Sequence, residues 1–308
     1  MKIQALKEKI HIEKVSSFLK KLSPSIGLII ILALGFGLGS LIPNFVNGNS
    51  GYFWNNRTPF SSDGSSNNSY NDSGYSSGED CSVIGINLHG YLTTYISSDG
   101  TNNSNSDSVA SEDIDAKIEN ANNDDRIKAI IIEVDSSGGS PVAGEEVANT
   151  IKNSQKPVVA FVRDTGASSA YWAISSADRI FASKNSDVGS IGVTLSYLTN
   201  VEKDRMDGYQ YEELNSGKYK NSGSPDKPLT ADERTLFMRD INIMYNNFMK
   251  AISDNRHIPL DKVQSFSDGS TFLGEQAKSL GVVDEIGGLK EVEKYLETKI
   301  GEKPVICW

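Results

Sequence analysis

The chain has 308 residues, which is long enough for one large hydrophobic core. Its formal net charge is −10, with 40 acidic against 30 basic residues, so the composition argues against a nucleic-acid partner. The three histidines are isolated and the two cysteines are far apart in the sequence, so the ligand spacing of a zinc site is missing. We therefore expect neither a metal nor another cofactor.

The N-terminal segment has the pattern of a membrane anchor. Six lysines within the first 21 residues precede a charge-free run whose apolar core is Ile26–Ile42. A helix over these residues would be about 25 Å long, slightly short of a hydrocarbon layer of about 30 Å. Including Phe45 and Val46 closes the gap. The lysine bias predicts a cytoplasmic segment 1–25, a transmembrane segment 26–46 in contact with lipid, and an extracytoplasmic remainder at the cell membrane. A cleaved signal peptide is the alternative.

Residues 47–81 predict a flexible linker. They are dominated by Asn, Ser and Gly and cannot bury enough apolar surface to order themselves. The two cysteines, Cys81 and Cys307, could form one disulfide outside the membrane, or both could stay free.

Residues 82–308 have the alternation of an α/β domain. Ile127–Val134 is a near-continuous β-branched run, as in a strand buried on both faces. Ser140 and Pro141 then open a helix, with the serine at the N-cap. Strands alternating with helices predict a mostly parallel sheet flanked by helices. The other expected strands are Ser82–Leu88, Val158–Val162 and Ile180–Ala182; the expected helices are Ser111–Asn122, one ending near Lys152, one starting at Ser168, Leu236–Ile252 and Leu289–Ile300.

Two stretches of small residues contain a candidate serine nucleophile and a candidate lysine base. Ser168 lies in Thr165–Trp172 and Lys220 lies in Asn215–Lys220. A serine hydroxyl is a poor nucleophile until a neighbouring base takes its proton. A lysine can do so if burial lowers the pKa of its ammonium from about 10.4 toward neutrality. A serine at the start of a helix can also be an ordinary N-cap, and most lysines are simply solvated.

From about Ser82 to Leu289 the chain resembles the signal peptide peptidase A family (protease IV type), in its single-copy form. These are membrane-anchored Ser–Lys peptidases with a fold related to the Clp proteases and the crotonases. Four stretches carry the resemblance, in order along some 200 residues: Val134–Pro141, Ala167–Ala182, Val188–Val193 with Ser216–Lys220, and Asp268–Gly288. The resemblance implies a ClpP/crotonase-like fold, preceded here by one transmembrane helix.

The resemblance also implies roles for residues. Ser168 matches the family's nucleophile, and the pair Ser216-Gly217 places Lys220, rather than its neighbour Lys218, at the base position. Ser190 matches a serine that orients the lysine amine, although a turn serine fits equally well. The backbone N–H groups of Gly138 and Gly139 are suited to an oxyanion hole.

Two departures from the family pattern bear on these assignments. Where the family has Ala-Ser-Gly-Gly, this chain has Ala167-Ser168-Ser169-Ala170, so Ser169 is a second candidate nucleophile. Ser137 stands where proline is common.

The resemblance predicts an endopeptidase that degrades remnant signal peptides or other membrane-associated peptides. It also predicts a homo-oligomeric ring in which Ser168 of one subunit meets Lys220 of the next. Two other functions are compatible with parts of the pattern. One is a non-catalytic membrane scaffold related to the family, and the other is a crotonase-like acyl-CoA enzyme.

Overall fold

The computed structural model describes residues 80–96 and 107–308, which all belong to one compact unit, Asn71–Trp308. The predicted segments 1–25 and 26–46, and most of the linker 47–81, lie outside the described residues. Among the residues that are described, no helix is both long enough and apolar enough to cross a membrane.

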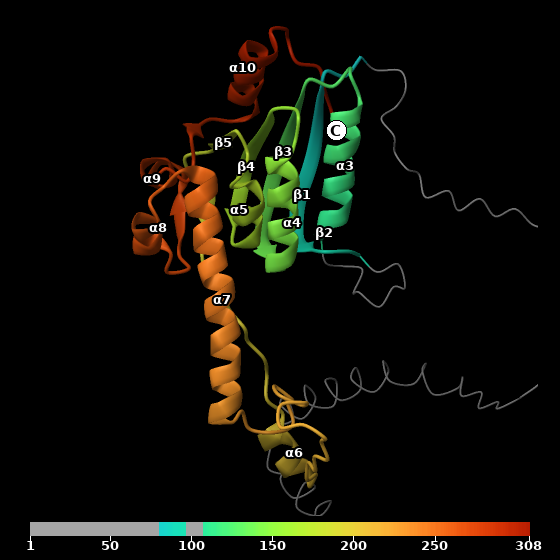
Figure 1. Ribbon diagram of the computed structural model, residues 1–308, viewed down its shortest axis with the longest axis vertical. Coiled ribbons are helices and arrows are strands. Elements are labelled where there is room, and N and C mark those ends of the chain that lie inside the picture. The colour runs from blue at the N-terminus through green and yellow to red at the C-terminus, as the bar shows by residue number, and fades with distance from the viewer. Residues whose placement is uncertain (1–79, 97–106) are drawn as a thin grey trace, which may run out of the picture. The chain divides into compact units, whose positions relative to one another are not determined.

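A nine-stranded sheet forms the centre of the domain (Figure 1). Its main path runs β2-β1-β3-β4-β5-β8, and neighbouring strands along this path are parallel. β6 pairs with β4, β7 joins β6 in the antiparallel sense, and β9 pairs with β1. The predicted α/β fold with a mostly parallel sheet is therefore confirmed. The strands are β1 Val83–Thr93, β2 Ser108–Ala110, β3 Ala129–Gly139, β4 Val158–Ala167, β5 Arg179–Ala182, β6 Asp187–Gly189, β7 Thr271–Leu273, β8 Glu285–Ile286 and β9 Ile306–Cys307.

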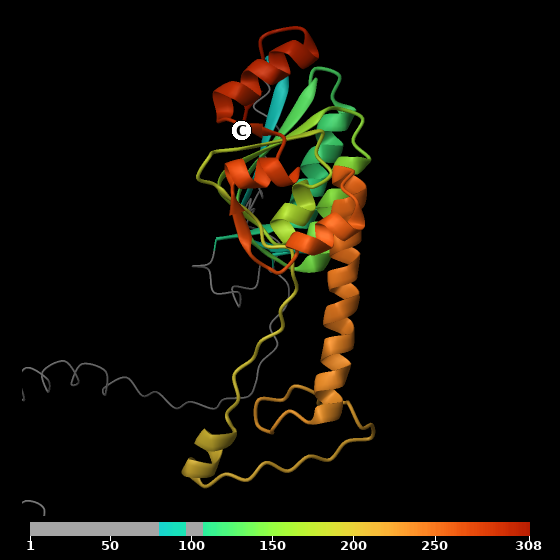
Figure 2. The same cartoon turned by 90° about the vertical axis from the view of Figure 1, so that its left-hand side faces the viewer.

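Helices cover the two faces of the sheet unequally. Figures 1 and 2 show α3, α4, α5 and part of α7 on one face, and α10 at one end of the other. The helices are α3 Ser111–Asn123, α4 Pro141–Lys152, α5 Ser169–Ile174, α6 Val201–Asp207, α7 Ala231–Arg256, α8 Leu260–Phe266, α9 Gly274–Leu280 and α10 Leu289–Ile300.

The β-branched run in β3 contributes buried apolar side chains to both faces of the sheet. Ile130 and Ile132 belong to the large apolar cluster under α3, α4 and α5, whereas Ile131 belongs to a smaller cluster with Val292 and Leu296 of α10. Alternate residues of a strand point to opposite faces, so a strand covered on both sides needs apolar residues throughout.

β3 continues beyond its predicted end, and this extension brings two glycines to the site described below. The ladder between β1 and β3 shifts register between His89 and Tyr91, then resumes by pairing Tyr91 with Gly138 and Leu92 with Gly139. A side chain at Gly139 would lie 1.9 Å from the carbonyl oxygen of Leu92. Glycine therefore permits the close pairing that continues the strand.

α7 is longer than the predicted helix Leu236–Ile252 because it begins at a capping box. The Thr230 hydroxyl accepts from the Glu233 backbone N–H at 3.2 Å, and the Glu233 carboxylate accepts from the Thr230 N–H at 2.9 Å. Toward its C-terminus α7 packs on α5, where the Trp172 and Phe248 rings stack with centroids 4.8 Å apart. In Figure 1 its N-terminal part continues away from the sheet to the region of α6.

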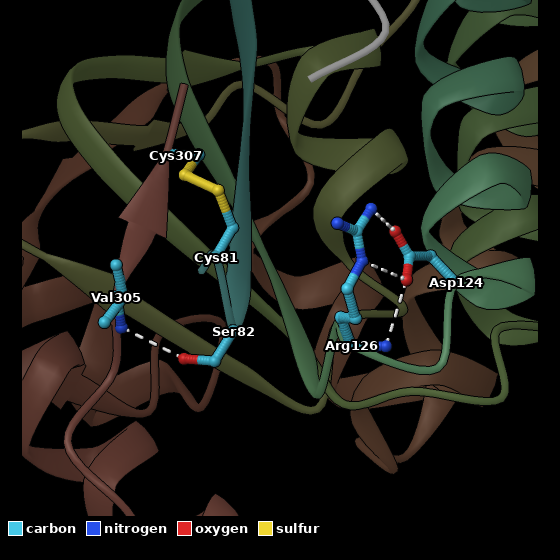
Figure 3. Close-up of a disulfide and its surroundings, with 6 residues drawn as sticks. All are labelled: Cys81, Ser82, Asp124, Arg126, Val305 and Cys307. Carbon is cyan, nitrogen blue, oxygen red and sulfur yellow. Dashed lines mark hydrogen bonds and ion pairs between the residues drawn. A yellow bond between two sulfur atoms is a disulfide. The ribbon is translucent and has the colours of Figure 1, made fainter. Parts of the chain in front are cut away.

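A disulfide between Cys81 and Cys307 joins the two ends of the domain (Figure 3). The sequence allowed either a disulfide or two free cysteines, and the structure has the disulfide. β9 lies beside β1, and the Val305 N–H donates to the Ser82 hydroxyl at 3.0 Å. The ring of Trp308 lies over Gly85, where a side chain would be 2.2 Å from it. The bridge closes a loop of 226 residues.

We expect Cys81→Ser with Cys307→Ser to lower the free energy of unfolding by about 2–5 kcal/mol, because the bridge restricts the unfolded chain. Denaturant unfolding of the purified protein measures the loss. Adding reductant should reproduce it in the original chain and leave the double variant unchanged. Equal stability of the two proteins in the absence of reductant would show that the bridge contributes nothing.

Candidate active site

Ser168 occupies a sharp turn between the end of β4 and the start of α5. Its backbone has φ 52° and ψ −129°, a conformation that side-chain-bearing residues rarely adopt. Its N–H donates to the Gly189 carbonyl oxygen at 2.8 Å, and its own carbonyl oxygen accepts from Trp172 N–H at 3.0 Å. Such a conformation costs about 1–3 kcal/mol and persists only where the surroundings impose it, which is typical of functional turns.

The hydroxyl of Ser168 does not cap the helix that follows. Ser168 is the N-cap residue of α5, yet its side chain makes no capping hydrogen bond. The ordinary structural role considered from the sequence is therefore not the one this side chain plays. Ser168 is partly exposed, whereas Ser169 is 3% exposed and its hydroxyl has no hydrogen-bond partner among the described residues. Of the two adjacent serines, Ser168 has the accessible hydroxyl.

The glycines at the end of β3 lie against this turn. A side chain at Gly138, where φ is 106°, would lie 2.7 Å from the Ser168 Cβ. The Gly138 N–H donates to the Ser136 hydroxyl at 3.1 Å, and that hydroxyl donates to the Gly90 carbonyl oxygen at 2.6 Å. The absence of a side chain at Gly138 thus allows β3 to approach Ser168 closely. Its N–H already donates to Ser136, so it is not free for the predicted oxyanion role. Gly139, the other predicted oxyanion residue, lines the pocket.

A pocket of about 530 Å³ opens beside Ser168. Trp172 of α5 and Met244 and Phe248 of α7 contribute an apolar wall. The lining residues are Gly139, Pro141, Ser168, Ser169, Trp172, Ser190, Gly192, Val193, Thr194, Leu195, Met244, Phe248, Asp268 and Gly269. This combination of an apolar hollow and a few polar groups is typical of a ligand site.

Ser190 lines the same pocket, in a turn after β6. Its φ is 50°, its N–H donates to the Ser270 carbonyl oxygen at 2.9 Å, and its hydroxyl donates to the Gly269 carbonyl oxygen at 3.0 Å. Ser190 therefore does act as a turn serine. Since the hydroxyl proton is given to Gly269, the oxygen lone pairs remain able to accept from an amine.

Lys220 lies apart from the pocket within this chain. It is exposed, and it is not among the described residues that line the pocket. Lys218, two residues earlier, forms an ion pair with Asp232 at the start of α7. Asp232 precedes Met244, a pocket residue, by twelve positions, which is roughly 18 Å along a helix. Of the residues predicted for the site, the structure brings Ser168, Ser190, Gly138 and Gly139 together and leaves Lys220 outside.

Lys218 is held in its charged form. Hydrogen bonding to the Asp232 carboxylate at 2.5 Å, and then to the Tyr219 side chain, raises the pKa of its amine above the usual value. Its amine is therefore a poorer base candidate than a lysine without such a partner.

Several site residues were not found from the sequence. The wall residues Met244 and Phe248 are four apart on a predicted helix, a spacing that places them on one face but is also that of any packed helix. Ser136, which engages the Gly138 N–H, lies inside the family-like stretch Val134–Pro141, and only the geometry distinguishes its role from that of a turn serine. The described residues contain no cluster of His, Cys, Asp or Glu able to hold a metal ion.

The site therefore combines a strained serine, glycine backbone beside it and an apolar pocket, which is an arrangement suited to acyl transfer. The sequence agrees, since residues 150–302 match the model of peptidase family S49. The match covers 153 of the 308 residues, and relatives named as SppA proteases support the signal peptide peptidase A family.

Named relatives point the same way. The chain is 36% identical over 176 residues to the "Putative protease MJ0651" of Methanocaldococcus jannaschii, a match covering 56% of this chain and 57% of the relative. It is 31% identical over 184 residues to the "Serine protease SPPA, chloroplastic" of Arabidopsis thaliana, a match covering 59% and 27%. The matched part thus spans just over half of the first relative and about a quarter of the second.

A solved structure of a ClpP1 mutant from Listeria monocytogenes superimposes with a TM-score of 0.44 at 15% identity, covering 68% of this chain and 92% of that one. At that level the match does not by itself define the fold.

We expect Gly138→Ala to stop modification of Ser168 by a fluorophosphonate, because the added methyl would push the serine out of its turn. Gly301→Ala is the matched control, since Gly301 also has positive φ (78°) but no atom lies near its absent side chain. Both variants should lose about 1–2 kcal/mol of stability from the backbone conformation. Labelling at the original rate in folded Gly138→Ala would show that the contact does not shape the site.

Proposed function

We propose that this chain is a membrane-anchored serine endopeptidase with a Ser168–Lys220 catalytic dyad. The observation that carries the proposal is the turn at Ser168, where a partly exposed, uncapped hydroxyl is held in a strained conformation beside a pocket. The match to peptidase family S49 supports a peptidase. We also propose that the α/β domain has a ClpP/crotonase-like fold.

The proposed reaction begins when the Ser168 Oγ attacks the substrate carbonyl carbon and its proton passes to the neutral Lys220 amine. The N–H groups of Gly139 and Ser169 are the proposed donors to the resulting oxyanion, since both residues line the pocket beside Ser168. The N–H of Ser169, at the start of α5, has no acceptor within that helix. The ammonium then protonates the leaving amine. A water molecule, deprotonated by Lys220, hydrolyses the ester at Ser168 and releases the acid.

The distance between Lys220 and the pocket supports a site completed by a second subunit. The segment around Lys220 also exposes large apolar side chains, which is typical of a surface covered by a partner. These are Leu198 (88% exposed), Met206 (78%), Tyr209 (73%), Leu214 (99%) and, less exposed, Tyr197, Tyr211 and Tyr219. We propose a homo-oligomeric ring in which this segment packs on a neighbour and delivers Lys220 to the neighbour's Ser168.

The proposed substrates are extended apolar peptides at the membrane, such as remnant signal peptides. The apolar wall formed by Trp172, Met244 and Phe248 supports an apolar side chain next to the scissile bond. The lysine-rich segment before Ile26 supports a cytoplasmic N-terminus and an extracytoplasmic catalytic domain. The Cys81–Cys307 disulfide is consistent with that side of the membrane, where thiols oxidise.

Ser168→Ala and Lys220→Ala should each reduce hydrolysis of a quenched apolar peptide to the background rate while leaving the fold and assembly intact. Ser169→Ala and Lys218→Ala are the matched controls and should keep measurable activity. The Ser169 hydroxyl is buried, and the Lys218 amine is paired with Asp232. Activity in Ser168→Ala together with its loss in Ser169→Ala would move the nucleophile by one residue. If the original chain neither cleaves peptides nor reacts with a fluorophosphonate, it is a scaffold.

Mixing Ser168→Ala and Lys220→Ala subunits should restore part of the activity, because some interfaces would then contain one intact serine and one intact lysine. Differently tagged chains are co-expressed, the doubly tagged assemblies are purified, and peptide hydrolysis is measured. Doubly tagged assemblies without activity would place both residues in one chain or reject the pair.

A further inference from the structure

The first turn of α7, where the segment from α6 ends, contains a nearly buried carboxylate. Glu233 is 3% exposed at its side chain, whereas the nearby ion pairs Arg205–Glu202 and Lys218–Asp232 are exposed by more than half. Exposed pairs contribute little to stability, and burying a charge is costly unless it is paired. A buried, paired carboxylate next to a largely exposed segment therefore indicates that its partner residues are held in a defined position.

Glu233 holds Lys227, and Lys227 holds Glu213. The Lys227 Nζ lies 2.9 Å from the Glu233 Oε1 and 3.1 Å from the Glu213 Oε2, and both of these side chains are less than a quarter exposed. The other oxygen of Glu233 accepts from the backbone N–H and the hydroxyl of Thr230, at 2.9 Å each. Hydrogen bonding from Thr230 and the Lys227 ammonium together lower the pKa of Glu233 to about 2, so the carboxylate stays charged at physiological pH.

These three side chains close the neck of a loop whose centre is Lys220. Glu213 precedes Lys220 by seven residues and Lys227 follows it by seven. Between them the backbone makes short-range turns, with Lys220 N–H donating to Gly217 O at 3.0 Å and Ser222 N–H to Tyr219 O at 3.3 Å. The loop is also held to the start of α6, where Asn200 N–H donates to Pro225 O at 2.7 Å.

We propose that Glu213, Lys227 and Glu233 form a clasp that positions Lys220 for catalysis by fixing the base of its loop to the first turn of α7. Lys227 and the two glutamates are positioning residues, since none of them lines the pocket beside Ser168. Charged residues suit the neck of this loop. Apolar residues there could instead pack on the exposed apolar side chains of the same segment, such as Leu214. This inference rests on the proposed role of Lys220.

The test compares Lys227→Met, Lys227→Arg and Glu233→Gln in the full-length assembled protein. Glutamine can still complete the capping box with Thr230, so Glu233→Gln removes the charge facing Lys227 while sparing the helix start. Lys128→Met is the control, because it breaks another single ion pair, Lys128–Glu302, at the opposite end of β3 from the site. Hydrogen exchange of peptides covering residues 214–226 is measured together with kcat and KM for an apolar peptide.

In Lys227→Met and Glu233→Gln we expect faster exchange in residues 214–226 and a kcat lowered by about 10–100-fold, with KM little changed, since small misplacement of a reacting group costs about this much. Lys227→Arg should restore both readouts, and Lys128→Met should change neither. Faster exchange with an unchanged kcat would overturn the positioning role, and so would unchanged exchange in Lys227→Met. If Lys220→Ala, assayed in parallel, keeps full activity, the base assignment fails and the positioning role fails with it, whatever the exchange shows.

Discussion

The close approach of β3 to the turn at Ser168 is the contact on which the site depends. Parallel strands end at the same edge of a sheet, so extending β3 by a few residues brings Gly138 and Gly139 to the point where β4 gives way to α5. The extension needs the register shift in the β1–β3 ladder and a chain without side chains at its end. The Ser168 conformation in turn needs the Gly189 carbonyl supplied by β6. Sheet pairing on two sides thus stabilises an unfavourable backbone at one residue.

The proposed Ser168–Lys220 pair would make activity depend on assembly, because the serine pocket and the lysine loop lie at different points along α7. The pocket contacts the helix near Met244 and Phe248, and the clasp holds the Lys220 loop to its first turn. In the proposed ring, an isolated chain would have a shaped pocket without a base. Peptide cleavage would then depend on subunit concentration by mass action, and unassembled chains would be inactive.

The sequence was sufficient for the fold class because its strongest pattern, the β-branched run around Ile130–Ile132, permits little besides a strand covered on both faces. Ser168 and Ser190 were predicted as site residues through similarity to a family, and the structure places both at one pocket. Nothing in the pattern Ser136-Ser137-Gly138-Gly139 shows that the strand continues, because the register shift depends on a partner strand some fifty residues earlier. The clasp was missed for the same reason. Glu213, Lys227 and Glu233 look like solvated charges until the loop that joins them is folded.

The disulfide makes the catalytic domain a covalently closed circle between its first and last strands. A cut anywhere between residues 81 and 307, including one in the exposed segment around Lys220, would leave both pieces attached to each other. A chain cut once in this region would therefore keep its two pieces together in one molecule. The damage would become visible only when the bridge is reduced.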